Sequence, residues 1–245
     1  MIFAQALDFS ALLNEEIIAL IIYPLFYLTY YFASDFPIIK KFRNRFGETK
    51  DNVEQSVYFR RSLGFVLLGL IPFFITLFYF QKPLGDYGLG LPSGEYALWW
   101  SLIPLAAVLI ISIFRSKSGI DLSYYPEVRK KDWMAKRTVV NAAFWAIYLL
   151  GYEFSLRGMV FYTTLYAYGL WPAIAINSVI YALIHIFKGP KEAFGAFFLG
   201  ILLCLITYYT NSIWVAFLIH VIMAVSNDIK AVNAVKKANN SAKSQ

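Results

Sequence analysis

The sequence predicts an all-α membrane protein, a bundle of roughly seven transmembrane helices (six to eight) that forms a single membrane domain over residues 1–245. Two observations lead to this fold. Hydrophobic residues make up 59% of the chain and charged residues 15%, whereas soluble domains have about 45–50% and about 25%. The apolar residues are also gathered in blocks of about 20, the length that a helix needs to cross the hydrocarbon core. These blocks do not alternate polar and apolar residues, so a barrel is not expected.

Seven apolar blocks are expected to be helices, because a helix satisfies its own backbone groups in lipid. The first three cover residues 17–33, 62–80 and 98–114. The last four cover residues 138–165, 171–187, 194–209 and 213–225. Residues 9–13 are expected to be a short interfacial lead-in, and the polar residues 234–245 a disordered tail.

Basic residues are distributed very unevenly between the connections. Twenty of the 22 Lys and Arg lie in four segments, residues 34–61, 115–137, 188–193 and the part after 225. With seven spans and the N-terminus outside, all four segments face the cytoplasm, which is the positive-inside pattern. The net charge of +7 therefore predicts contact with anionic lipid headgroups and not with nucleic acid.

Neither the N-terminal residues nor the cysteine content indicates a functional site. The first residues are acidic and lack a basic segment, which argues against a cleaved secretory signal. A single cysteine, Cys204, rules out an internal disulfide and is expected to be a packing residue.

Ionisable residues at depth in a span are candidates for function, because a charge facing lipid is costly. Four such residues lie in the last four predicted helices: Glu153, Arg157, His185 and His220. Glu153 and Arg157 stand four residues apart with the acid first, the favourable order for a helical ion pair. One hypothesis is that the pair merely neutralises itself. The other makes Glu153 a general base or metal ligand that faces both histidines.

Two further patterns accompany these residues. Asn177, Tyr181 and His185 recur every four residues and form a polar stripe that must face protein or water. Ala196 and Gly200 form a surface of small residues on the next helix, which allows close packing. We interpret that second pattern as structural.

The residues of the C-terminal half resemble a known family. The segments YEFSLRGMVFY, YALIHIF and GAFFLGILLCLITYYTNSIWVAFLIH are similar to the CPBP family of intramembrane proteases, which includes CAAX prenyl endopeptidases of the Rce1 type and bacterial Abi proteins. The resemblance covers residues 138–228. It implies catalytic roles for Glu153, Arg157, His185 and His220, and an inner (cytoplasmic) membrane location in a bacterium.

Two positions depart from the family pattern. Tyr152 replaces the first glutamate of EExxxR, which in the family is held to activate water, and a tyrosine hydroxyl is a poor base at neutral pH. Ala224 replaces the Asn or Asp thought to hold the oxyanion. Asn227 and Asp228 follow one turn later, too near the cytoplasmic end to replace it.

Three functions follow as alternatives. The first is a CPBP-type endopeptidase that cleaves a membrane-associated protein or peptide by carboxylate-activated water. The second is a non-catalytic relative that binds a membrane partner, since two catalytic positions are changed. A proton-coupled transporter is the third. No cofactor is expected, although Glu153, His185 and His220 could instead hold zinc.

Overall fold

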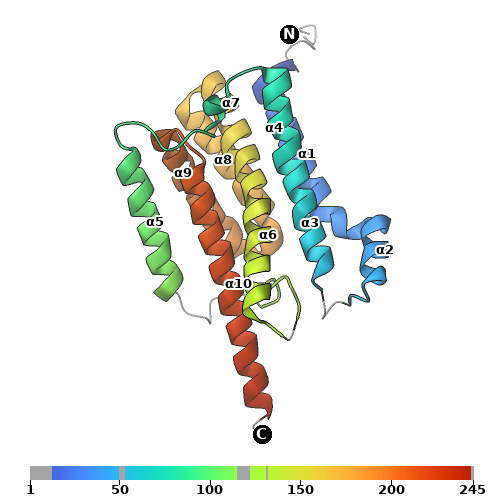
Figure 1. The fold of residues 1–245 in the computed structure, drawn as a ribbon. Helices are drawn as coiled ribbons and strands as arrows, with labels where there is room; N and C mark the ends of the chain where they lie inside the picture. Colours follow the sequence, from blue (N-terminus) through green and yellow to red (C-terminus); the bar gives the residue numbers. More distant parts are fainter. Residues whose placement is uncertain (1–12, 50–52, 115–121, 131, 244–245) are drawn as a thin grey trace, which may run out of the picture.

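The structure, a computed structural model, describes residues 13–49, 53–114, 122–130 and 132–243, and within them it contains helices and no β-strand. Seven helical segments are long and apolar enough to cross a membrane. Figure 1 shows them side by side in one bundle, with the two chain ends at opposite ends of it. The predicted fold class and number of spans are confirmed.

The first three spans come from the N-terminal half. α1 (Glu15–Phe32) is followed by the short helix α2 (Pro37–Arg45), which lies outside the bundle beside its lower end in Figure 1. The second span contains α3 (Gln55–Phe65), α4 (Ile71–Ile75) and π-helical turns that continue it to Phe80. The third is α5 (Ala97–Phe114), at the edge of the bundle.

The last four spans follow the predicted order. The fourth contains α6 (Ala135–Glu153), a π-helical turn (Phe154–Val160) and α7 (Phe161–Tyr168). α8 (Leu170–His185) and α9 (Pro190–Thr210) come next. α10 (Trp214–Lys243) is the longest helix and extends below the bundle in Figure 1.

Two predicted boundaries need correction, and one predicted segment lies mostly outside the described residues. The second span begins at Gln55 and not at residue 62, because Arg60 and Arg61 lie inside the helix and are paired there with Glu127. α10 continues to Lys243, where we expected a disordered tail from residue 234. Of the predicted lead-in at residues 9–13, all but the last lie outside the described residues.

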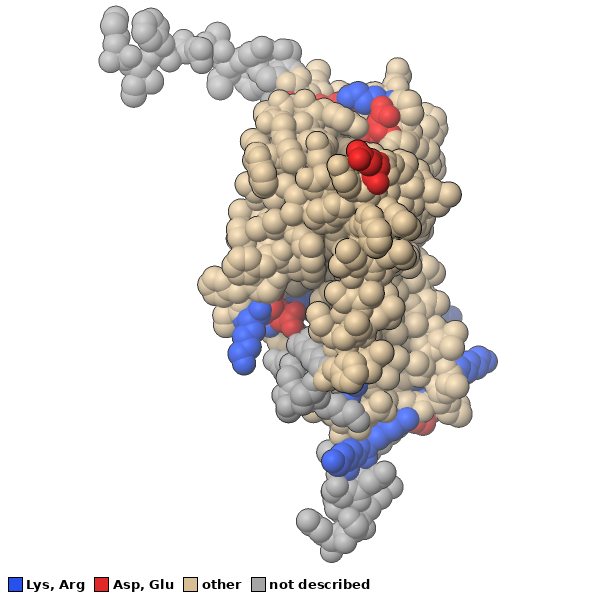
Figure 2. Space-filling view, turned by 90° about the vertical axis from the view of Figure 1, so that its left-hand side faces the viewer, with Lys and Arg blue, Asp and Glu red and all other residues tan. Residues whose placement is uncertain are grey.

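On the face shown in Figure 2, Lys, Arg, Asp and Glu lie toward the top and bottom, with a broad uncharged band between them. The apolar side chains exposed along the spans, such as Phe78, Ile103 and Phe198, therefore face lipid. The chain is an integral membrane protein.

The spans approach one another closely where glycines remove the side chain. A Cβ added to Gly151 of α6 would lie 2.9 Å from the backbone nitrogen of Gly69 in the second span. At the α8–α9 contact, a Cβ on Gly200 would lie 3.1 Å from Cα of Ser178. The close packing expected at Ala196 and Gly200 is present, and Ala196 is buried.

Candidate active site

The candidate site begins where the fourth span changes its helical geometry. Glu153 is the last residue of α6, and Arg157 lies in the π-helical turn that follows. π-helical turns inside α-helices occur often at functional sites. Here the neighbouring spans support the turn: Ser155 donates to the Leu68 carbonyl at 2.5 Å, and the Asn177 amide donates to the Leu156 carbonyl at 2.6 Å. The wider turn is thus held on two sides.

Glu153 connects a cation and a histidine from another span. Its side chain is fully buried, and its Oε1 lies 2.6 Å from Nδ1 of His220 in α10. The same oxygen lies 3.4 Å from Nη1 of Arg157, which is also fully buried. The ion pair predicted from the i, i+4 spacing is therefore present, and it also contacts a histidine 67 residues later in the chain.

The second carboxylate oxygen of Glu153 is different. No group in the described parts of the chain hydrogen-bonds Oε2, although it is buried. Asp228 Oδ1 also lacks a partner among the described residues. A buried carboxylate oxygen with no protein partner calls for an explanation, of which a catalytic role is one. Glu153 therefore presents one oxygen that is held in place and one that is available.

Tyr181 links α8, the span that carries His185, to this group. The Arg157 guanidinium lies 4.3 Å from the centre of the Tyr181 ring, a cation–π contact. The His185 ring lies 4.5 Å from the same ring, and that of His220 lies 6.0 Å from it. His185 therefore borders the charged pair across Tyr181, without a hydrogen bond to Glu153 or His220 among the described residues.

Both histidines have one ring nitrogen fixed by an acceptor. Nδ1 of His185 lies 2.8 Å from the Tyr181 carbonyl, and Nδ1 of His220 contacts the Glu153 carboxylate. Because a carbonyl and a carboxylate only accept, each Nδ1 carries the proton. In the neutral form of each ring, Nε2 is then the nitrogen that can accept a proton.

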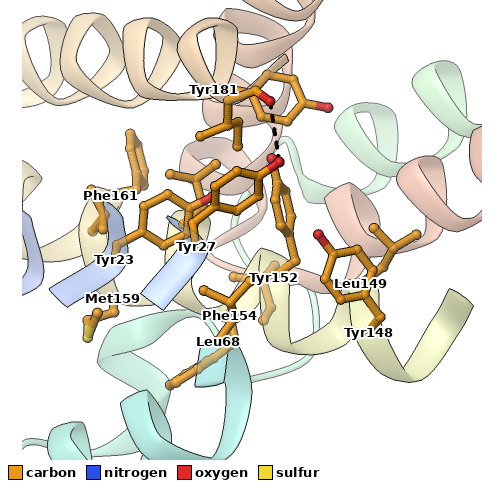
Figure 3. Close-up of a cluster of buried hydrophobic side chains, with 14 of the residues drawn as sticks. Tyr23, Tyr27, Leu68, Tyr148, Leu149, Tyr152, Phe154, Met159, Phe161 and Tyr181 are labelled. Atoms are coloured by element: carbon orange, nitrogen blue, oxygen red, sulfur yellow. Dashed lines mark hydrogen bonds between the residues drawn. The ribbon is translucent and has the colours of Figure 1, made fainter. Parts of the chain in front are cut away.

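Tyr152 fills the position of the first family glutamate with an aromatic ring. Its ring lies 5.3 Å from that of His220, edge to face, and 6.3 Å and 6.4 Å from those of Tyr23 and Tyr27 in α1. Figure 3 shows the rings of Tyr23 and Tyr27 from α1, Tyr152 from α6 and Tyr181 from α8 converging. The tyrosine is thus part of the packed core beside the site.

The other departure, Ala224, leaves no polar group at its position. Asp228, one turn further along α10, is held elsewhere: its Oδ2 accepts from Trp145 at 2.6 Å and from Asn141 at 2.8 Å. With a rise of about 1.5 Å per residue, Asp228 lies roughly 12 Å along the helix from His220. The position of Asp228 agrees with the expectation that it does not replace the family Asn or Asp.

Metal-ligating groups converge only in pairs. Within the residues that the structure describes, no three His, Cys, Asp or Glu side chains lie close enough to hold a metal ion. Glu153 and His220 are the two that meet directly.

The comparison with protein families agrees with the resemblance. Residues 136–226 match the family described as type II CAAX prenyl endopeptidase Rce1-like. This segment of the chain is therefore similar to an Rce1-like domain. No curated protein and no solved structure matches the chain significantly. The Rce1-like domain includes Glu153, Arg157, His185 and His220, and it is consistent with the CPBP family.

A second buried polar cluster was missed by the sequence analysis. Arg61 is fully buried near the lower end of the bundle, where it donates to Asn141 at 2.7 Å and to Glu127 at 3.1 Å. Its guanidinium also lies 3.9 Å from the Trp145 ring. The available signal was Asn141, a polar residue inside an apolar block. The cluster lies outside the Rce1-like motif residues and ties the spans together.

Proposed function

We propose that the protein is an intramembrane endopeptidase that cleaves a membrane-associated protein or peptide with water activated by Glu153. The observation that carries this proposal is the asymmetry of Glu153: His220 and Arg157 hold Oε1, while Oε2 has no hydrogen-bond partner among the described residues. A carboxylate fixed by one oxygen and free at the other is suited to take a proton from a bound water. The Rce1-like domain supports the same class of reaction.

In the proposed reaction, Glu153 Oε2 accepts a proton from water as the water oxygen attacks the peptide carbonyl carbon. The tetrahedral intermediate then collapses, the carbon–nitrogen bond breaks, and the proton passes to the leaving amine. Arg157 and Tyr181 are positioning residues in this scheme. A histidine Nε2 that carries a proton, in His185 or His220, donates a hydrogen bond to the developing oxyanion and keeps that proton when the intermediate collapses.

An activity assay tests the proposal. The purified protein is reconstituted in liposomes and given farnesylated reporter peptides with a CAAX terminus, together with a set of unmodified membrane-protein substrates. Replacing Glu153 by Gln, which keeps the shape but removes the base, should lower kcat by about 10²–10⁴. The matched control is Glu95→Gln, because Glu95 is exposed in the turn before α5. Equal cleavage by the Glu153→Gln variant and the unmodified protein would refute the mechanism.

A second function is favoured by Tyr152 and Ala224. Because the ring of Tyr152 packs where the family has its first glutamate, the protein could keep the fold and bind a membrane partner without hydrolysis. The double variant Tyr152→Glu with Ala224→Asn tests this alternative. Cleavage that appears only in this double variant would support a non-catalytic role, and strong cleavage by the unmodified protein would exclude it.

We propose further that the protein lies in a bacterial cytoplasmic membrane with its N-terminus outside and its C-terminus in the cytoplasm. The support is that α2, the segment before α6, the turn after α8 and the end of α10 lie at one end of the bundle (Figure 1). Because Cys204 is buried, single cysteines introduced at Lys41 and Lys82 can be labelled selectively. An impermeant maleimide added to intact cells should label the Lys82→Cys variant and not the Lys41→Cys variant.

A further inference from the structure

A cavity of about 630 Å³ lies at the basic end of the bundle, and Glu153 is not part of its lining. Its wall comes from the end of α1, from α2 and α3, from the segment before α6 and from the turn after α8. The volume is within the range of about 300–1,000 Å³ that is typical of ligand pockets. Four of its lining residues are cations: Arg43, Arg60, Arg129 and Lys188.

The cations of the cavity are only partly neutralised. The two acidic lining residues are Asp35 and Glu127. Asp35 lies 4.0 Å from Lys40, which is outside the cavity, and Glu127 pairs with Arg60 and Arg61. Across the described part of the chain, no carboxylate forms a salt bridge with the other three lining cations. The cavity therefore has an excess of positive charge.

Glu127 itself remains ionised at the base of this cavity. Burial alone would raise the pKa of the Glu127 carboxyl, but the positive charges of Arg60, Arg61 and Lys188 outweigh it and bring the pKa down to about 2. One ionised carboxylate thus faces three cations. An anion that enters the cavity meets a favourable field even when Glu127 is fully charged.

The wall of the cavity is held in place before any ligand binds. Arg129 donates to the carbonyls of Leu122 at 3.1 Å and Ser123 at 2.6 Å. Tyr124 donates to the Phe187 carbonyl at 2.7 Å, and the Phe187 ring stacks on that of Tyr31 at 4.3 Å. These contacts fix the loop before α6 against α1 and the turn after α8.

Apolar side chains beside the cavity place it at the membrane surface. Phe32 and Phe187 line the cavity and are 46% and 40% exposed, and Ile38 at the start of α2 is 71% exposed. α2 also carries Lys40 and Lys41 and is too short to span. A basic helix with exposed apolar residues is typical of segments that lie at the lipid interface. A ligand that combines an anionic group with hydrocarbon fits both parts of this surface.

We propose that this cavity binds the phosphate headgroup of an anionic phospholipid, with its acyl chains lying over Phe32, Phe187 and Ile38. Arg43 contacts the phosphate through the paired hydrogen bonds that a guanidinium offers, and Lys188 contacts it as a point charge. Arg129, which donates to Leu122 and Ser123, adds positive charge to the wall. A lipid of this kind anchors the loop before α6 at the membrane surface. The inference does not depend on peptidase activity.

Native mass spectrometry of the full chain, released from micelles with defined amounts of phosphatidylglycerol or phosphatidylcholine, tests the site. The double variant Arg43→Gln with Lys188→Gln should bind phosphatidylglycerol about 25-fold more weakly, since each cation near a membrane surface contributes about five-fold in affinity. The matched control is Lys41→Gln with Lys191→Gln. It removes the same charge from exposed positions near the same two segments, outside the cavity lining.

The expected result is a loss of phosphatidylglycerol binding in the cavity variant only, with phosphatidylcholine binding weak and unchanged throughout. Equal losses in both double variants would overturn the proposal, because they would indicate diffuse attraction to the basic surface. Displacement of the lipid by millimolar inorganic phosphate would overturn the choice of a lipid as the ligand. If the double variant fails to fold by circular dichroism, the single variants Arg43→Gln and Lys41→Gln give the same comparison.

Discussion

Removing the Arg157 charge while leaving Glu153 in place should destabilise the protein strongly. In an Arg157→Met variant, Glu153 stays fully buried and keeps only the hydrogen bond from His220. The lost pair has its charged atoms 3.4 Å apart. With an effective dielectric constant of about 20, this separation corresponds to about 5 kcal/mol of attraction. Measured costs of breaking a buried ion pair from one side are about 3–5 kcal/mol.

Removing both charges together should cost much less than the two single changes added. In the double variant Glu153→Gln with Arg157→Met, no uncompensated charge remains, and replacing both partners of a buried pair is often close to neutral. The contact between Arg157 and the Tyr181 ring is lost in both Arg157 variants, so it cancels in the comparison. The coupling between the two sites should therefore exceed about 2 kcal/mol.

The free energy of unfolding is measured in detergent micelles by titration with sodium dodecyl sulfate, followed by circular dichroism. Lys41→Met serves as a control, because Lys41 is exposed on α2 and its loss should change stability by less than about 0.5 kcal/mol. Additive single and double effects would refute the reasoning. They would mean that Glu153 and Arg157 do not depend on one another for burial.

Two further predictions concern packing and pH. Gly151→Ala should destabilise the protein by about 1–3 kcal/mol, because its Cβ would meet the Gly69 backbone at 2.9 Å. The control is Gly195→Ala on α9, where no atom lies within 4 Å of the added Cβ. Equal melting temperatures of the two variants would contradict the prediction. Glu127 has a pKa of about 2 against an ordinary 4.5. Its ionised form should therefore add about 3 kcal/mol to the free energy of unfolding above pH 5, and this contribution is lost as the pH falls toward 2. Chemical unfolding at pH 7 and pH 3 measures this loss of stability. The loss should be smaller in the Glu127→Gln variant. An unchanged pH dependence in that variant would assign the acid sensitivity to other groups.

The number and order of the spans could be predicted because lipid allows few alternatives. A block of apolar residues long enough to cross the hydrocarbon core has to be helical. Boundaries at charged residues were less certain. Arg60 and Arg61 looked like loop residues, but they enter α3 because Glu127, which lies in a distant connection, pairs with them. Local hydropathy cannot register a partner 66 residues away.

The candidate site was partly readable for a similar reason. Ionisable residues at depth are rare, so Glu153, Arg157, His185 and His220 stood out in an apolar sequence. The contact between Glu153 and His220 joins two spans, and the periodicity of either helix carries no information on it. The π-helical turn after Glu153 was not predicted either. It depends on hydrogen bonds from Ser155 to the second span and from Asn177 in α8.

The two changed family positions bear differently on function. Ala224 removes a polar group without replacing it, so any oxyanion would have to be held by the histidines. Tyr152 instead adds an aromatic wall against His220 and the α1 tyrosines. Such a wall excludes water from one side of His220, which strengthens the electrostatic interactions there.

A purely structural role of Glu153 explains the contacts of Oε1 but not the state of Oε2. If the carboxylate served only to neutralise Arg157, a low-energy arrangement would use both oxygens, since every unpaired buried charge raises the cost of burial. Instead, Arg157 and His220 share Oε1, and Oε2 has no protein partner among the described residues. The protein thus bears the cost of a buried carboxylate that is only half satisfied. The proposed hydrolysis rests on this unpaired oxygen, because a group that accepts a proton during a reaction needs a free lone pair.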